Sequence, residues 1–184
     1  MPRIPYPPAD LAEPAELLQA IRRRRGGTLL RLDRMLLHSP AFAAGWNSLL
    51  GAVRQQLQLD AGLRELAICA VARLNRADYE FEQHAPEFLA AGGTRAQLDA
   101  LADVHEAFTD KAGNTPFDST QRAILALAYD MTRKVDIDDA HFAAAQAALP
   151  RQQLVELIGV VAAYNMVSRF LVALGLHSEH GEPG

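Results

Sequence analysis

The fold is decided by residues 63–101, LRELAICAVARLNRADYEFEQHAPEFLAAGGTRAQLDAL. In this stretch, segments whose apolar residues have helical spacing are separated by residues that end helices. After Asp60, a residue type that favours the helix N-cap, apolar side chains recur every three or four residues up to Leu74. A second helical segment covers about 77–91 and ends at a pair of glycines. The stretch therefore predicts a helical hairpin with a short turn.

Helix signals continue on both sides of this hairpin, while alternating strand patterns are almost missing. Upstream of the hairpin, glycines mark the end of one helix and a Ser-Pro pair marks the start of another. Downstream, capping boxes at Thr94 and Asp118 mark the start of two further helices. We therefore expect an all-α protein. The other expected helices with both ends assigned cover residues 14–25, 28–37, 40–56, 138–149 and 150–174.

The length of 184 residues suits one compact domain. We predict an N-terminal helical appendage over residues 1–37, a core over 38–176 and a flexible tail over 177–184. Within the core, residues 110–117 form the one obvious long loop.

Composition excludes several functional classes. A net charge of −4 gives no reason to expect nucleic-acid binding, and the single basic cluster, Arg22 to Arg25, suits a helix C-terminus. One cysteine, Cys69, allows no disulfide within the chain. Since the N-terminus lacks an apolar signal segment, we expect a cytoplasmic protein with no membrane partner.

The last helix is apolar around most of its circumference. The stretch 154–176 is interrupted by Glu156, Asn165 and Arg169, which are costly in hydrocarbon, so we expect a buried helix and not a membrane span. Asn165 and Arg169 need polar partners there, and a structural network with carboxylates is expected. An apolar helix of this kind also favours a homo-oligomer.

Three residues of the hairpin suggest chemistry. Glu80 and His84 lie four apart on one helix and share a face, and an antiparallel hairpin brings Glu65 of the preceding helix towards His84. Carboxylates that hold an imidazole fix its tautomer and raise its proton affinity, as a general acid or base near neutral pH requires. An exposed Glu and His pair with only a structural role is the alternative reading.

The hairpin resembles the core of the carboxymuconolactone decarboxylase and alkylhydroperoxidase D-like family. The similarity extends upstream to RRGGTLLRLDRMLLHSPAFAAGWNSLL and downstream to YNMVSRFLVALG. In alkylhydroperoxidase D the hairpin carries a glutamate, a Cys-x-x-Cys pair and a histidine. Aligned on His84, the glutamate falls at Glu65, while Ala77 and Glu80 occupy the cysteine positions.

The resemblance implies an alkylhydroperoxidase D-like fold and a trimer or hexamer. Both cysteines are absent, and dithiol peroxidase chemistry requires them, so a cycle of that kind is not expected. The decarboxylase branch instead suggests a small-molecule lyase, in which Glu65, Glu80 and His84 transfer protons. No cofactor and no metal are expected, and a small-molecule substrate is the expected partner.

Two rival functions stay open. The first is a peroxidase-related activity through Cys69, which is more simply a small core residue. The second is a binding protein that keeps the pocket without turnover. In either case the pocket wall is expected to involve aromatic side chains, although such residues are commonly core: Trp46, Tyr79 and Phe81.

Overall fold

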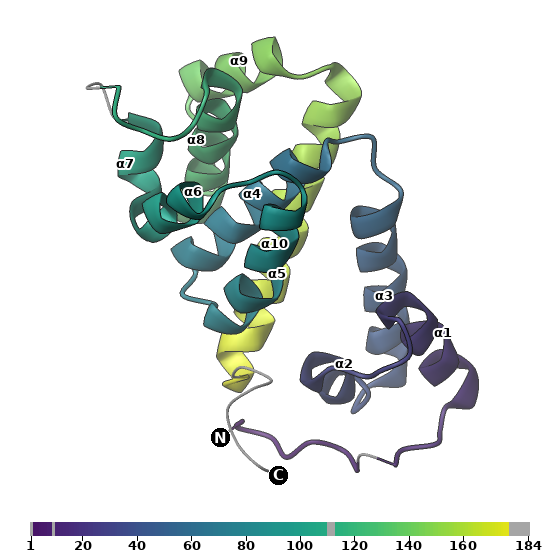
Figure 1. The fold of residues 1–184 in the computed structure, drawn as a ribbon. Helices are drawn as coiled ribbons and strands as arrows, with labels where there is room; N and C mark the ends of the chain where they lie inside the picture. Colours follow the sequence, from purple (N-terminus) through teal and green to yellow (C-terminus); the bar gives the residue numbers. More distant parts are fainter. Residues whose placement is uncertain (1, 9, 110–112, 177–184) are drawn as a thin grey trace. The chain divides into compact units, whose positions relative to one another are not determined.

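Helices are the only regular secondary structure within residues 2–8, 10–109 and 113–176, which this computed structural model describes (Figure 1). The prediction of an all-α protein is confirmed. The predicted tail, 177–184, lies outside the described residues, as do residues 110–112 of the predicted loop. In order the elements are α1 (Ala15–Arg25), α2 (Arg31–Leu36), α3 (Pro40–Gln55), α4 (Ala61–Leu74), α5 (Asp78–Ala90), α6 (Arg95–Ala100), the 3-10 turn η1 (Leu101–Asp103), α7 (Val104–Thr109), α8 (Ser119–Arg133), α9 (Asp139–Ala148) and α10 (Arg151–Leu174).

The chain divides into two compact units. An N-terminal unit comprises the residues up to Gln56 and the chain end from Ala173, and a core unit comprises Leu57–Val172. The sequence suggests a boundary after residue 37, whereas the units separate after α3. The hairpin and all the residues proposed for proton transfer belong to the core unit.

Within the N-terminal unit, a buried carboxylate explains the basic cluster. Asp33 is inaccessible to solvent and forms salt bridges with Arg24 and Arg25 at the end of α1. Its other interaction, accepting the backbone N–H of Leu30 at 3.0 Å, caps α2. The helix expected from residue 28 therefore begins at Arg31.

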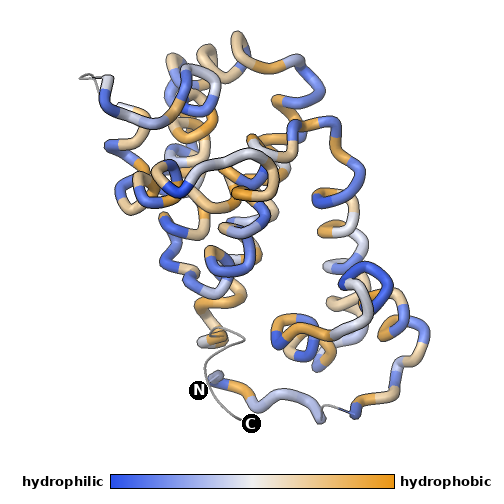
Figure 2. The backbone as a smooth tube through the Cα atoms, in the orientation of Figure 1, coloured by the Kyte–Doolittle hydropathy of each residue, from blue (hydrophilic) through white to orange (hydrophobic). Residues whose placement is uncertain are grey.

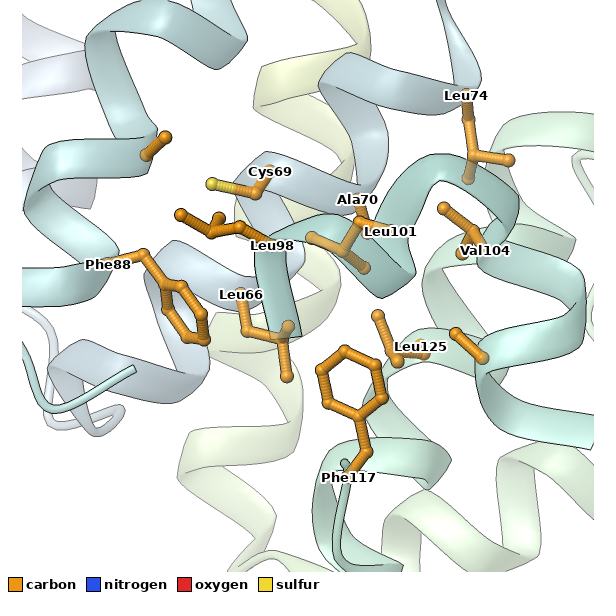
Figure 3. Close-up of a cluster of buried hydrophobic side chains, with 12 residues drawn as sticks. Leu66, Cys69, Ala70, Leu74, Phe88, Leu98, Leu101, Val104, Phe117 and Leu125 are labelled. Carbon is orange, nitrogen blue, oxygen red and sulfur yellow. The ribbon is translucent and has the colours of Figure 1, made fainter. Parts of the chain in front are cut away.

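In the core unit, α4 packs against both α5 and α8. The residues from Glu65 to Ala72 are all buried, so α4 is enclosed on every face and not along one stripe only. Figure 3 shows part of this core, in which Leu66 and Cys69 lie near Phe88. A polar side chain on α4 must consequently find its partners inside the protein.

The predicted helix starts are confirmed where a side chain caps the backbone. The carboxylate of Asp60 accepts the N–H of Leu63 at 3.0 Å, and reciprocal capping boxes open α6 at Thr94 and α8 at Asp118. These local interactions fix where the helices begin and thus which side chains each helix face carries.

Helix α10 combines high hydropathy with burial. An 18-residue window has a mean hydropathy of 1.8, enough by length and composition to cross a membrane, but half of that window is buried inside the protein. Figure 2 shows hydrophobic and hydrophilic residues interspersed along the chain's helices. Burial of this extent is typical of the core helix of a folded domain.

Candidate functional site

A tight turn creates the site by reversing the chain between α4 and α5. Asn75 ends α4, Arg76 adopts a left-handed conformation with φ of 56°, and Ala77 precedes the first residue of α5. The two helices pack directly against each other after this reversal. His84 in the second turn of α5 thereby comes close to Glu65 in the second turn of α4, as the hairpin prediction requires.

The hairpin brings Glu65 and His84 into direct contact. Glu65 Oε2 and His84 Nδ1 are 2.6 Å apart, and the two residues are 4% and 3% exposed. The other carboxylate oxygen, Oε1, accepts from Nε of Arg64 at 3.1 Å. A buried carboxylate is thus held between a guanidinium and an imidazole.

The charge state of this pair follows from its surroundings. Burial raises the pKa of the Glu65 carboxyl, but the hydrogen bond and charge of His84, together with Arg64, outweigh burial and hold the pKa below its ordinary value. An ionised carboxylate only accepts hydrogen bonds, so Nδ1 of His84 carries the proton of the short contact. The hydrogen bond from Nδ1 to Glu65 therefore fixes the orientation of the imidazole ring.

Glu80 is buried as well and engages the last helix. It is 2% exposed, and its Oε2 accepts a hydrogen bond from the hydroxyl of Ser168 on α10. The charges of both Glu65 and Glu80 raise the pKa of Cys69, so both carboxylates act on the same part of the core. Glu80 also lies in the first turn of α5, where the helix dipole favours an anion.

The structure adds two residues of α10 to the site, Tyr164 and Ser168. Tyr164 meets the His84 ring edge to face, with ring centroids 5.0 Å apart, and Ser168 holds Glu80. Their spacing of four residues places both on one face of an apolar helix, a signal present in the sequence. Sequence reasoning singled out their neighbours Asn165 and Arg169 instead.

Cys69 lies in an environment that suppresses the thiolate. The residue is fully buried, and burial, reinforced by the charges of Glu65 and Glu80, raises the pKa of its thiol far above the ordinary range. Arg73 opposes this shift without overcoming it. Since the thiolate is the nucleophilic form, these surroundings disfavour a nucleophilic role for Cys69.

The three aromatic residues expected to line the pocket lie in different environments. Tyr79 is buried at the start of α5, while the ring of Phe81 lies 3.5 Å beneath the guanidinium of Arg73. Trp46 belongs to the N-terminal unit, where its ring meets that of Phe42 with centroids 5.7 Å apart. Of these three, Tyr79 and Phe81 lie on the helix that carries His84.

Asn165 and Arg169 form a polar network whose partners are amide and hydroxyl groups and not the expected carboxylates. Asn165 Nδ2 donates to the hydroxyl of Thr132 at 2.9 Å and to the carbonyl of Val161 at 3.0 Å. Its Oδ1 accepts from Asn75 at 3.0 Å and from Arg169 at 2.8 Å. Through Asn75, the network ties the turn before α5 to α10 and α8, and so supports the position of the site.

Metal binding has no obvious location in the described part of the chain. Among residues 2–8, 10–109 and 113–176, no group of three histidine, cysteine, aspartate or glutamate side chains is arranged to hold an ion.

Known proteins share this fold at low sequence identity. Uncharacterised peroxidase-related proteins from Silicibacter sp. TM1040 and Ralstonia eutropha JMP134, the latter described as an alkylhydroperoxidase AhpD core, are 16% and 18% identical to this chain. Their TM-scores are 0.78 and 0.79; each alignment covers 97% of this chain and 92% or 93% of the other.

A third similar structure is a variant of the debrominase Bmp8 in complex with 2,3,4-tribromopyrrole. It is 14% identical, with a TM-score of 0.75 over 97% of this chain and 91% of Bmp8. At such identities these likenesses show the fold alone. No curated protein matches the sequence.

The family model named carboxymuconolactone decarboxylase family matches residues 40–113, the stretch that contains the hairpin with Glu65 and His84. The resemblance recognised from the sequence is confirmed: residues 40–113 match the model of that family, and the fold is all-α and alkylhydroperoxidase D-like.

Proposed function

We propose that this protein is a small-molecule enzyme of the lyase or decarboxylase kind, in which the His84 and Glu65 pair transfers a proton. The single observation that carries the proposal is the buried contact of 2.6 Å between His84 Nδ1 and Glu65 Oε2. A carboxylate placed on one ring nitrogen orients an imidazole and leaves its other nitrogen to exchange protons with a substrate.

Glu65 has a positioning role in this proposal. Its ionised carboxylate accepts the Nδ1 proton and stabilises the imidazolium form when Nε2 also carries a proton. Arg64 satisfies the second carboxylate oxygen, which keeps Glu65 from becoming an alternative proton acceptor. The proton that reacts is therefore the one on Nε2 of His84.

The proposed step is protonation at carbon. When an unsaturated lactone acid loses carbon dioxide, the electron pair of the broken carbon–carbon bond remains on the organic fragment. His84 Nε2–H gives its proton to that carbon, which leaves neutral imidazole, and a proton from water restores the acid. No oxidant or reductant enters the balance.

Glu80 has a second role that follows from its charge. A buried carboxylate close to the pair serves either as a base or as the partner of a positively charged substrate group. Ser168 fixes its orientation through the hydrogen bond to Oε2. We propose that Ser168 and Tyr164 position the two ionisable groups of α5 from the side of α10.

The rival peroxidase reaction through Cys69 is less well supported. Its thiol is fully buried and its pKa is strongly raised, whereas attack on a peroxide needs an accessible thiolate. The similarity to peroxidase-related proteins supports the shared fold without supplying the missing thiolate.

The test uses carboxymuconolactone, the compound in the family's name, together with related unsaturated lactone acids. Each is incubated with the protein in D2O, and release of carbon dioxide and deuterium at carbon are both measured. We expect both in the wild type, with rates at least a hundredfold lower in His84→Gln. His141→Gln is the control, because it also removes a carboxylate-bound imidazole of the core unit.

Two results would overturn the proposal. Turnover that is equal in wild type and His84→Gln would remove His84 from the reaction. Compounds that raise the melting temperature without being converted by the wild type would favour the binding-protein alternative.

A further inference from the structure

A cavity lies in the core unit, and none of the residues proposed for proton transfer lines it. It has a volume of about 450 Å3 and is bordered by the end of α4, by η1 and the start of α7, and by α8. Its apolar lining includes Leu74, Leu101 and Val104, all of which belong to the buried core of Figure 3. The surface that faces the cavity is mostly polar, and a cavity of this size can hold a ring-sized molecule.

Two arginines line this cavity from different helices. Arg73 comes from the last turn of α4 and Arg133 from the last turn of α8. Neither forms a salt bridge with any residue in the described part of the chain. Two guanidinium groups facing one cavity repel each other, and an anion placed between them would relieve that repulsion.

The side chain of Arg73 is held in place by an aromatic ring. Its guanidinium lies over Phe81 of α5, 3.5 Å from the ring centroid. Stacking of this kind occupies the planar face and leaves the N–H groups at the edge free to donate to an oxyanion.

One carboxylate, that of Asp103, also lines the cavity, and it accepts a hydrogen bond from the backbone. Asp103 Oδ1 accepts the backbone N–H of Glu106 at 3.0 Å, within the first turn of α7. The charge of Asp103 therefore offsets one arginine at most, and the lining keeps a net positive charge.

Two polar aromatic side chains also line the cavity that Arg73 and Arg133 line. His105 and Tyr129 both line the cavity, and their ring centroids are 5.2 Å apart. An imidazole N–H and a phenol O–H add hydrogen-bond donors of the kind that oxyanions accept. The two ring faces also suit contact with a planar ligand.

We infer that this cavity binds a small organic oxyanion, a carboxylate or a phosphate ester attached to a ring-sized body. The arginines bind the anionic head, and the rings of His105 and Tyr129 contact the ring of the ligand. This site is distinct from the Glu65 and His84 pair and does not depend on the proposed function.

Isothermal titration with phenyl phosphate, benzoate, benzamide and inorganic phosphate tests the inference. We expect at least one of the two ring-bearing anions to bind, and both neutral benzamide and inorganic phosphate to bind at least tenfold more weakly. The stronger of phenyl phosphate and benzoate identifies the head group. Affinity should also fall as salt is raised.

Single substitutions locate the binding. Arg73→Gln and Arg133→Gln should each weaken binding about tenfold. Arg95→Gln removes an exposed arginine outside the cavity lining and should leave affinity unchanged, as should His84→Gln. Absence of binding by both ring-bearing anions, or equal affinity in Arg73→Gln, Arg133→Gln and wild type, would overturn the inference.

Discussion

Two carboxylate and histidine pairs of the core unit have nearly the same geometry and different surroundings. In one, Glu65 Oε2 lies 2.6 Å from Nδ1 of His84; in the other, Asp130 Oδ2 lies 2.7 Å from Nδ1 of His141. The side chains of the first pair are almost inaccessible, whereas the side chain of His141 is one-third exposed. Distance alone therefore does not distinguish them.

The difference lies in what else each carboxylate binds. Asp130 also forms a salt bridge with Lys134, whose Nζ lies 2.8 Å from Oδ1, and accepts the backbone N–H of Asp138 at 3.1 Å, so it joins the end of α8 to the start of α9. The turn between them includes Val135, whose φ of 70° is unfavourable for a β-branched residue. We conclude that Asp130 stabilises a strained turn.

Glu65 joins two helices that already pack directly together. Its partners are Arg64 and His84, and no turn depends on it. The proposed function assigns proton transfer to this buried imidazole, while the imidazole of His141 is one of several donors around a structural anion. The predictions below test this contrast.

The largest expected effect concerns catalysis. Substitution of His84 by glutamine should lower turnover of any substrate identified in the lactone screen by a factor of about 10² to 10⁴, whereas His141→Gln should change it less than about threefold. Steady-state rates measured well below both melting temperatures decide this. Equal losses in the two variants would mean that the pairs are not functionally distinct.

The second expected effect concerns stability, for which the pair of Asp130 and His141 should matter more than the pair of Glu65 and His84. Asp130→Asn removes the negative charge that Lys134 and His141 contact and should lower the free energy of unfolding by about 2 kcal/mol, because hydrogen bonds to a charged group are stronger than neutral ones. Asp99→Asn changes an exposed aspartate and should stay within about 0.5 kcal/mol of wild type. Urea unfolding monitored by circular dichroism measures both. A loss below about 1 kcal/mol for Asp130→Asn would contradict the structural role.

The third effect appears on acidification. The folded-state pKa of Glu65 lies below its ordinary value of 4.5, so its stabilisation is complete above that pH and is lost as pH falls through the folded pKa. In Glu65→Gln this part of the acid dependence should disappear. Urea unfolding at a series of pH values from about 6 to about 3 reads the difference. Parallel curves for the two proteins would show that Glu65 is not stabilised by its partners.

The smallest effect concerns the strained turn itself. Val135 is 83% exposed, so its replacement by glycine loses little burial while relieving the left-handed conformation. Val135→Gly should raise the free energy of unfolding by about 0.5 to 1 kcal/mol. Val155→Gly is the matched control at an exposed valine in the helical conformation and should destabilise the protein. A loss of stability in Val135→Gly would show that strain in this turn is not limiting.

Local sequence signals predicted most of the fold because they act over a few residues. The caps at Asp60, Thr94 and Asp118 and the final α10 agree with the structure to within a few residues. The start of α2 was misplaced because it depends on Asp33, whose position is itself fixed by the arginines of α1. The boundary between units likewise depends on tertiary contacts that no local pattern encodes.

The contact between Glu65 and His84 could be predicted from helical spacing and from the family's hairpin. The short turn leaves few ways for α4 and α5 to pack against each other, so the helix faces that meet are largely determined. Ser168 and Tyr164 could not be assigned in that way, because their partners lie more than 75 residues earlier in the chain. Their roles depend on the rotation of α10 about its axis, which its nearly uniform apolar surface does not reveal.

The most direct test of the central claim is an NMR pH titration of the His84 ring in wild type, Glu65→Gln and Glu80→Gln. We expect a protonated Nδ1 in the wild type and a ring pKa that is lowered in Glu65→Gln, because the nearby carboxylate favours the imidazolium form. Removal of Glu80 should lower it as well, by less, because its Oε2 is bound to Ser168. Titration curves that overlay in all three proteins would contradict the claim, since the carboxylates would then have no influence on the imidazole that they are proposed to control.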